Sequence, residues 1–254
     1  MILANNLEGL NKWYGSIHAE NNWARIQILT QIEFALGLTF VPEPFDATKA
    51  PGGNVCMAHS PEVRNEYKIT FGPIELLDYI YAVLHSIRFR EKFKQHLKID
   101  FSKVPSPKET ETFWQMVFLG GGLRQLHLLE FPKGEEYCAS YPIEGDNTIT
   151  RQFTETSPGF EPDDSTFAGD QGDVRGESPI VFGKVWINDK QYFDRISQKV
   201  WECYIGHYQP AQKWLKDHRG ITLSYEDILH YQKICAALNE TQRLIREIDA
   251  FEIG

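Results

Sequence analysis

The residues with types suited to catalysis are Asp46, Glu66 and Lys68. Glu66 and Lys68 flank Tyr67, and with Asp46 they resemble the two carboxylates and the lysine with which many nucleases hold a metal ion and activate water. Such short patterns also arise by chance in an acidic chain, and Glu66 and Lys68 are more simply residues of a strand edge. A metal-dependent nuclease is therefore an alternative interpretation and not the first one.

Other catalytic and metal-binding motifs are absent from the sequence. It contains no Gly-x-Ser-x-Gly, no His-Glu-x-x-His, no glycine-rich dinucleotide fingerprint and no Walker loop. Cys56 with His59, and Cys203 with His207, have metal-ligand types but lack the repeated Cys-x-x-Cys spacing of a zinc site. We therefore expect no metal site and no catalytic residues in this chain.

Charge is distributed unevenly along the 254 residues. The net charge of −9 disfavours nucleic acid binding by itself, because phosphate contacts need clustered Lys and Arg. However, the acids concentrate in residues 155–177, whereas residues 85–103 are basic, and basic residues accompany aromatic ones in 184–192 and 208–219. The candidate contacts to phosphates or bases are Arg88, Arg90, Lys92 and Lys94, followed by Lys184, Lys190, Lys213, Lys216 and Arg219. The alternatives are a solvated helix face and lysine stems that cover the rings of buried aromatics.

Helical periodicity predicts the elements that position the first basic group. Residues 21–36 fit one amphipathic helix, and Pro73 suits the first turn of another, with Ile74, Leu77, Ile80, Tyr81 and Leu84 inward. Phe89, Phe93 and Leu97 continue this stripe at steps of four, so the basic residues between them point to the other side.

Two further helices are expected. Residues 109–130 contain Gly120, Gly121 and Gly122, each of which costs a helix about 1 kcal/mol relative to Ala. This run predicts a kink, a break or a neighbour packed against bare backbone. Ser224 with Asp227 predicts the start of the last helix. Its apolar stripe consists of Tyr231, Ile234, Leu238, Thr241, Ile245 and Ile248.

Strands are predicted at residues 38–41, 148–153, 180–187, 191–193 and 200–205, with a turn at 188–190. The expected fold class is α/β of the α+β type, with a small mixed or antiparallel sheet and a helical C-terminal part over 200–254. We expect one domain over 1–254, with a possible subdivision near 131–180 by the acidic loop insertion. No stretch has the length and apolarity of a membrane span or the pattern of a signal peptide. The four cysteines do not indicate a disulfide framework, so a cytoplasmic location is expected.

Several segments carry a family likeness. Residues 77–86 (Leu-Asp-Tyr-Ile-Tyr-Ala-Val-Leu-His-Ser), Arg90 and residues 97–101 resemble the C-terminal specificity region of Type ISP restriction-modification enzymes, which is related to regions of adenine-specific DNA methylases. Residues 36–40, 113–130, 200–217 and 223–249 extend the resemblance in the same order. One departure is His207, where the family usually has glycine, which puts in doubt any backbone conformation that needs glycine there.

The resemblance implies a target recognition domain that binds duplex DNA and positions an adenine methyltransferase, either in cis or as a separate chain. The Asn-Pro-Pro-Tyr or Asn-Pro-Pro-Phe motif of that methyltransferase and a site for its S-adenosylmethionine are absent here, so the chain itself is expected to be no enzyme and to need no cofactor. Sequence choice is expected in the loops at 42–68 and 131–179. The alternatives are the metal-dependent nuclease and a protein-interaction subunit whose last helix docks a partner through its apolar stripe.

Overall fold

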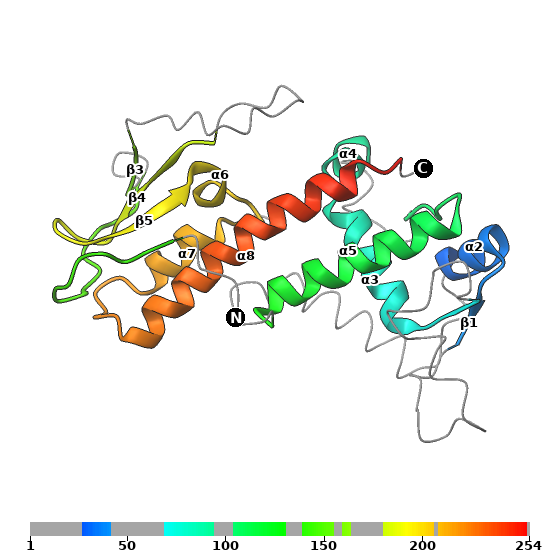
Figure 1. The fold of residues 1–254 in the computed structure, drawn as a ribbon, viewed down its shortest axis with the longest axis horizontal. Coiled ribbons are helices and arrows are strands. Elements are labelled where there is room, and N and C mark those ends of the chain that lie inside the picture. The colour runs from blue at the N-terminus through cyan, green and yellow to red at the C-terminus, as the bar shows by residue number, and fades with distance from the viewer. Residues whose placement is uncertain are drawn as a thin grey trace, which may run out of the picture. The chain divides into compact units, whose positions relative to one another are not determined.

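The structure, a computed structural model, describes residues 27–41, 69–93, 104–130, 139–154, 159–163, 180–205 and 208–252. The chain divides into two compact units (Figure 1). The sheet unit comprises Met1–Leu7 and Leu126–Thr241, and the helical unit comprises Glu8–Gln125 and Gln242–Gly254. The two longest helices, α5 (Thr110–Leu128) and α8 (Tyr225–Asp249), contribute residues to both units.

The helical unit contains α2 (Gln27–Leu36), β1 (Thr39–Phe40), β2 (Thr70–Phe71), α3 (Pro73–His85) and α4 (Ile87–Lys92). The strands β1 and β2 pair in parallel. Gly37 follows α2 with a φ of 66°, a backbone conformation that glycine adopts without a steric penalty. Pro73 lies at the first turn of α3, where its missing N–H has no helical partner to lose, as the sequence predicts.

The helix expected from Pro73 to beyond Phe89 is interrupted at Ser86. There the backbone has φ −58° and ψ 125°, and the Ser86 hydroxyl accepts the Phe89 N–H to begin α4. The predicted inward stripe of α3 was also partly wrong. Ile74, which was expected to face inward, is 44% exposed, and every residue from Leu76 to Val83 is buried, including those outside the stripe.

The glycine run in α5 lies in a continuous helix, without a break. A Cβ on Gly120 would lie only 1.8 Å from the backbone carbonyl oxygen of Asp78 in α3. Of the three outcomes the sequence left open, the neighbour packed against bare backbone is the one observed. Beside this crossing, Asp78 forms an ion pair with Arg124, whose Nε lies 2.6 Å from Oδ1 and whose Nη2 lies 3.1 Å from Oδ2.

The sheet unit is built on the antiparallel sheet β3-β4-β5, whose strands are Phe160–Pro162, Phe182–Trp186 and Tyr192–Ser197 (Figure 1). Buried residues of β4 and β5, such as Val185 and Phe193, pack with α6 (Gln198–Trp201), α7 (Pro210–Asp217) and the first turns of α8 in one apolar core. The hairpin predicted at 180–193 is confirmed.

Two predicted strands in this unit were wrong. Residues 200–205 begin within helix α6, because the Ser197 hydroxyl caps the N–H of Val200 and both Val200 and Trp201 are buried in the core. Residues 148–153 form no strand, and Thr148 instead makes an isolated bridge with Thr222.

The last helix begins as predicted. The Asp227 carboxylate accepts the Ser224 N–H at 2.9 Å, and the Ser224 hydroxyl accepts the Asp227 N–H at 3.2 Å. The Ser224 N–H and the Ser224 hydroxyl both donate to the Asp227 carboxylate, and these two bonds hold the pKa of Asp227 below its usual value. All six residues of the predicted apolar stripe of α8 are buried within the chain.

The α+β fold with a small antiparallel sheet is confirmed. Within the described ranges, none of the helices combines the length and the apolarity that crossing a membrane would require. The first residues of the helix expected at 21–36, all of the loop expected at 42–68 and most of the loop expected at 131–179 lie outside the described residues.

Candidate nucleic-acid interface

Helix α4 presents three of the predicted basic contacts. Arg88, Arg90 and Lys92 are exposed, whereas Phe89 between them is 3% exposed. The Lys92 ammonium lies 5.4 Å from the centre of the Phe93 ring, a distance at which a cation and an aromatic ring attract each other. Lys94 lies outside the described residues. The helix therefore directs its basic residues to solvent while one aromatic side chain anchors it.

The start of α4 is held by a carboxylate from the end of α8. Asp249 Oδ1 accepts the Ser86 hydroxyl at 2.6 Å and the Arg88 N–H at 3.4 Å, and its Oδ2 accepts the Ile87 N–H at 3.3 Å. A six-residue helix is unstable by itself, because its few hydrogen bonds do not offset the cost of nucleation. These capping bonds therefore help to fix the orientation of the basic residues.

His85 precedes this start. Its Nδ1 lies 2.8 Å from the Tyr81 carbonyl oxygen, so the ring N–H donates to that carbonyl. Burial lowers the pKa of His85 to about 4, and the charge of Arg90 lowers it further against the opposing effect of the carbonyl. His85 is therefore neutral at pH 7 and adds no positive charge to the basic group on α4.

In the sheet unit, the hairpin β4–β5 carries Lys184 among aromatic residues. The Lys184 ammonium lies 5.2 Å from the centre of the Tyr192 ring, and the rings of Trp186 and Tyr192 are 4.7 Å apart. The Trp186 indole N–H donates to the Glu161 carboxylate at 2.6 Å. This face of the sheet is therefore a packed aromatic surface with one positive and one negative group.

Lys190 lies in the exposed turn that joins β4 and β5. The side-chain oxygen of Asn188 accepts the backbone N–H of Lys190 at 2.9 Å and that of Gln191 at 2.7 Å. The buried side chain of Asn188 therefore stabilises the turn. The backbone that carries the Lys190 side chain is thereby ordered.

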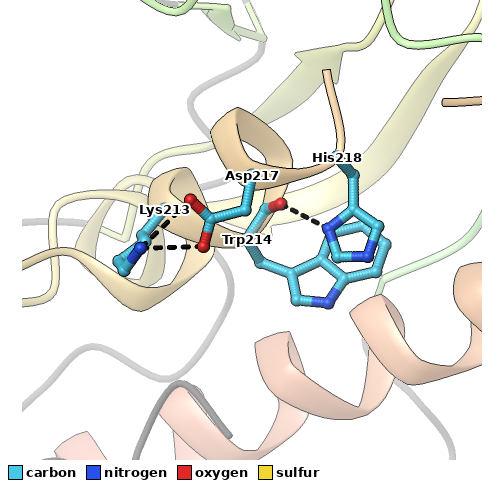
Figure 2. A network of polar contacts seen from close by, with 4 residues as sticks. All are labelled: Lys213, Trp214, Asp217 and His218. Carbon is cyan, nitrogen blue, oxygen red and sulfur yellow. Dashed lines mark hydrogen bonds and ion pairs between the residues drawn. The ribbon is translucent and has the colours of Figure 1, made fainter. Parts of the chain in front are cut away.

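Helix α7 and the residues after it carry the last three candidates. Figure 2 shows that Lys213 contacts both carboxylate oxygens of Asp217, at 3.0 and 2.8 Å. Trp214 of the same helix is buried and stacks on His218, with ring centres 3.8 Å apart. Lys216 and Arg219 are exposed. The charge of Lys213 is therefore balanced within the helix, and Trp214 is a core residue.

A family model decides which proteins this chain is related to. The model of the Type ISP C-terminal specificity domain matches residues 43–247, which is most of the chain. The chain belongs to this family. The resemblance predicted from the sequence is confirmed.

Two solved structures are similar to this Type ISP specificity domain. One is an ATP-dependent Type ISP restriction-modification enzyme, LlaBIII, bound to DNA, with 18% identity over 76% of this chain and 12% of that chain and a TM-score of 0.46. The other is a nuclease-deletion mutant of the Type ISP restriction-modification enzyme LlaGI in complex with a DNA substrate mimic, with 19% identity over 71% of this chain and 14% of that chain and a TM-score of 0.45. The chain thus spans less than a sixth of the length of either enzyme chain. No curated protein matches the chain.

The nine basic residues predicted for the Type ISP specificity domain fall into both units. Arg88, Arg90 and Lys92 belong to the helical unit, and the other five described ones belong to the sheet unit. The structure brings Lys213, Lys216 and Arg219 together on and after one helix. Their contacts with DNA stay a prediction.

The nuclease alternative rests on residues that the structure does not describe, namely Asp46, Glu66 and Lys68. The described part of the chain contains no group of three or more His, Cys, Asp or Glu arranged to hold a metal ion. The two metal pairs considered from the sequence were Cys56 with His59 and Cys203 with His207. Cys203 is a buried thiol, and the other three residues lie outside the described ranges.

Sequence reasoning missed the residues that fix the basic ones in place. Asp249 caps α4 from 163 residues beyond Ser86, a distance at which a single sequence carries no local signal. Asn188 was read only as a turn residue, although its amide and that of Gln191 are buried. The ion pair of Lys213 with Asp217 could have been predicted from the sequence, because the two residues have the i, i+4 spacing of neighbours on a helix.

Proposed function

We propose that this chain is a DNA-reading module, the target recognition part of an adenine-specific Type ISP restriction-modification system, and that its ligand is duplex DNA. The observation that carries the proposal is the family match over residues 43–247, since a specificity domain serves to select a target. The two similar enzymes are themselves in complex with DNA or with a DNA substrate mimic.

The proposal assigns the DNA contacts to the exposed cations of both units. Arg88, Arg90 and Lys92 project from one short helix whose start is capped, so little backbone flexibility has to be lost when they bind phosphates. In the sheet unit, Lys190, Lys216 and Arg219 are exposed in the same way. Lys184 and Lys213 already interact with Tyr192 and Asp217, and DNA would compete with those partners.

The chemistry belongs, in this proposal, to a methyltransferase domain in cis or in a separate chain. That domain would bind S-adenosylmethionine and hold the flipped adenine, and the present chain would be no enzyme itself. The support is that the sequence lacks the Asn-Pro-Pro-Tyr or Asn-Pro-Pro-Phe motif of such methyltransferases.

The experiment is fluorescence anisotropy of the 254-residue chain with a labelled mixed-sequence duplex at graded salt. For a DNA reader, the logarithm of the binding constant falls linearly with the logarithm of the salt concentration, with a slope of about 0.9 per phosphate contacted. The double variant Arg88→Ala with Arg90→Ala is expected to bind more weakly to all duplexes and to lower the slope by about 2.

A matched control is Lys108→Ala with Lys199→Ala, which removes the same formal charge from two exposed residues outside the predicted set. Its salt slope is expected to equal that of the unmodified chain. Equal slopes for both double variants would remove the assignment to α4, and no binding at low salt would overturn the DNA-reading function itself.

The rival functions predict other outcomes in the same samples. A nuclease would cleave the duplex when magnesium or manganese is added, and Glu66→Ala would abolish the cleavage. The interaction-subunit alternative is weakened, because the apolar stripe of α8 is buried within the chain and presents no free surface to a partner.

A further inference from the structure

Two buried amides join two loops of the sheet unit, residues 143–150 and 187–191, and backbone hydrogen bonds join a third, residues 218–223. We name these three loops the loop platform. Gln191 is 2% exposed and Asn188 is 9% exposed. The Gln191 amide donates to the Ile143 carbonyl oxygen at 3.0 Å and to Asn147 Oδ1 at 2.8 Å, and its oxygen accepts the Asn147 N–H at 2.9 Å. The Asn188 amide donates to the Thr148 carbonyl oxygen at 3.0 Å. Fully bonded buried amides of this kind rigidify the backbone that they connect.

The third loop is joined to the first by backbone bonds. The N–H of Leu223 donates to the Asn147 carbonyl oxygen at 3.0 Å, and the N–H of Gly220 donates to the Ile149 carbonyl oxygen at 2.8 Å. The hydroxyls of Thr148 and Thr222 lie 2.9 Å apart at the exposed side of this junction. The three loops are therefore one connected structure, although they come from distant parts of the sequence.

The platform also contains backbone in the left-handed region. Asn147 has a φ of 57°, and both its backbone N–H and its side-chain oxygen are bonded to Gln191. A Cβ on Gly145 would lie 2.6 Å from the Gln191 side chain, so the loop passes closely over that amide. Asparagine adopts this conformation more readily than most other non-glycine residues, so the residue type at position 147 suits the turn that these bonds hold.

The polar groups at the exposed side of the platform are of types that can contact nucleic acids. Thr148 and Thr222 present hydroxyls that can donate to or accept from base edges, and Lys190 and Arg219 are cations within the second and third loops. Two exposed acids, Asp146 and Asp189, lie beside them. Because carboxylates repel phosphates and accept hydrogen bonds from the cytosine amino group, the acids favour base edges over the DNA backbone next to the threonines.

We infer that the loop platform reads base edges, with Thr148 and Thr222 as specificity-determining residues and with Lys190 and Arg219 contacting the flanking phosphates. The inference rests on the proposed DNA-reading function and names the part of the chain that makes the sequence choice. A rigid platform suits this role, since groups that are held in place before binding lose little entropy on binding.

The test is selection of bound duplexes from a randomised DNA pool, followed by sequencing, for the 254-residue chain and its variants. Thr148→Val and Thr222→Val remove one hydroxyl each with little change in shape, and both residues lie in extended backbone bridges that valine tolerates. Thr39→Val is the matched control, because Thr39 is an exposed threonine in strand β1 of the helical unit. Circular dichroism checks that each variant is folded.

The unmodified chain and Thr39→Val are expected to select the same consensus. Each of the two platform variants is expected to lose preference at one or two base positions, by roughly tenfold per position, while retaining its affinity for unselected duplexes. If the unmodified chain selects a consensus that both platform variants retain, the inference is overturned and the DNA-reading function stands. If the unmodified chain selects no consensus, sequence reading by this chain is overturned and the inference with it.

Discussion

The hydroxyl of Ser86 donates a hydrogen bond of 2.6 Å to the carboxylate of Asp249, a residue 163 positions later in the chain. Ser86 ends α3 and begins α4, and Asp249 is the last residue of α8. Because the same carboxylate accepts the N–H groups of Ile87 and Arg88, the end of α8 completes the start of the helix that carries Arg88, Arg90 and Lys92. The orientation of these basic residues therefore depends on a residue far outside their own segment.

Asp249→Ala removes three hydrogen bonds at the start of α4. We expect the free energy of unfolding to fall by about 1–2 kcal/mol, as it does when a helix cap is lost. Urea unfolding at pH 7 measures the change. Glu252→Ala is the control, since Glu252 is an exposed carboxylate near the same end of the chain, and its effect should stay within about 0.5 kcal/mol. Equal effects of the two substitutions would mean that the cap contributes nothing measurable.

Gly120→Ala is expected to destabilise the helical unit strongly. The added Cβ would lie 1.8 Å from the backbone oxygen of Asp78, so α3 or α5 would have to shift, and we expect a loss of about 3 kcal/mol or more despite the higher helix propensity of alanine. Gly122→Ala in the same helix is the control. Its Cβ would meet only the end of the Leu244 side chain, at 3.3 Å, so the propensity gain of about 1 kcal/mol is expected to offset most of the crowding. Thermal unfolding of both variants separates these outcomes, and similar melting temperatures would contradict the close backbone contact.

Local signals in the sequence predicted part of this fold. Ser224 and Asp227 marked the start of α8 because both capping partners lie within one helical turn. The glycine run in α5 indicated close packing as one of three outcomes, since helices keep such costly residues where a neighbour needs the space. The spacing of Phe89 within a basic segment likewise predicted that the cations of α4 face solvent.

The errors arose where distant contacts override local preference. Residues 200–205 are rich in the β-branched and aromatic types that favour strands, yet Val200 and Trp201 form helix α6, because the core buries both and Ser197 caps the turn. The break at Ser86 was missed because the apolar spacing continues across it. In the candidate site, the types and exposure of the cations were predictable, but the supporting groups Asp249 and Gln191 were not, since their partners lie tens of residues away.

The stability of the chain is expected to depend on the protonation of His85. Burial lowers the pKa of His85 in the folded state to about 4, whereas the unfolded value is about 6.5. Between these values the unfolded chain binds a proton that the folded chain does not, so stability is lost as the pH falls from about 6.5 toward 4. The expected loss from this residue is about 1–2 kcal/mol between pH 7.5 and pH 5. Urea unfolding at both pH values measures it.

His85→Gln is the variant that isolates this effect, because glutamine does not titrate. It should lose less stability than the unmodified chain over the same pH interval. Part of the loss should remain, since burial also lowers the pKa of His230. Parallel curves for the two proteins would show that His85 is readily protonated in the folded state.

Asp217 is expected to limit the contribution of Lys213 to DNA binding. The two side chains form an exposed ion pair at i, i+4, and such pairs are worth at most about 1 kcal/mol, so a phosphate can compete for the lysine only at a small cost (Figure 2). Asp217→Asn is therefore expected to strengthen binding to mixed-sequence duplex and to raise the salt slope by up to about 0.9 as Lys213 gains a phosphate contact. In a Lys213→Ala background the same substitution should leave the slope unchanged. A rise of equal size in both backgrounds would show that Asp217 acts only through its own charge and that Lys213 makes no contact with DNA.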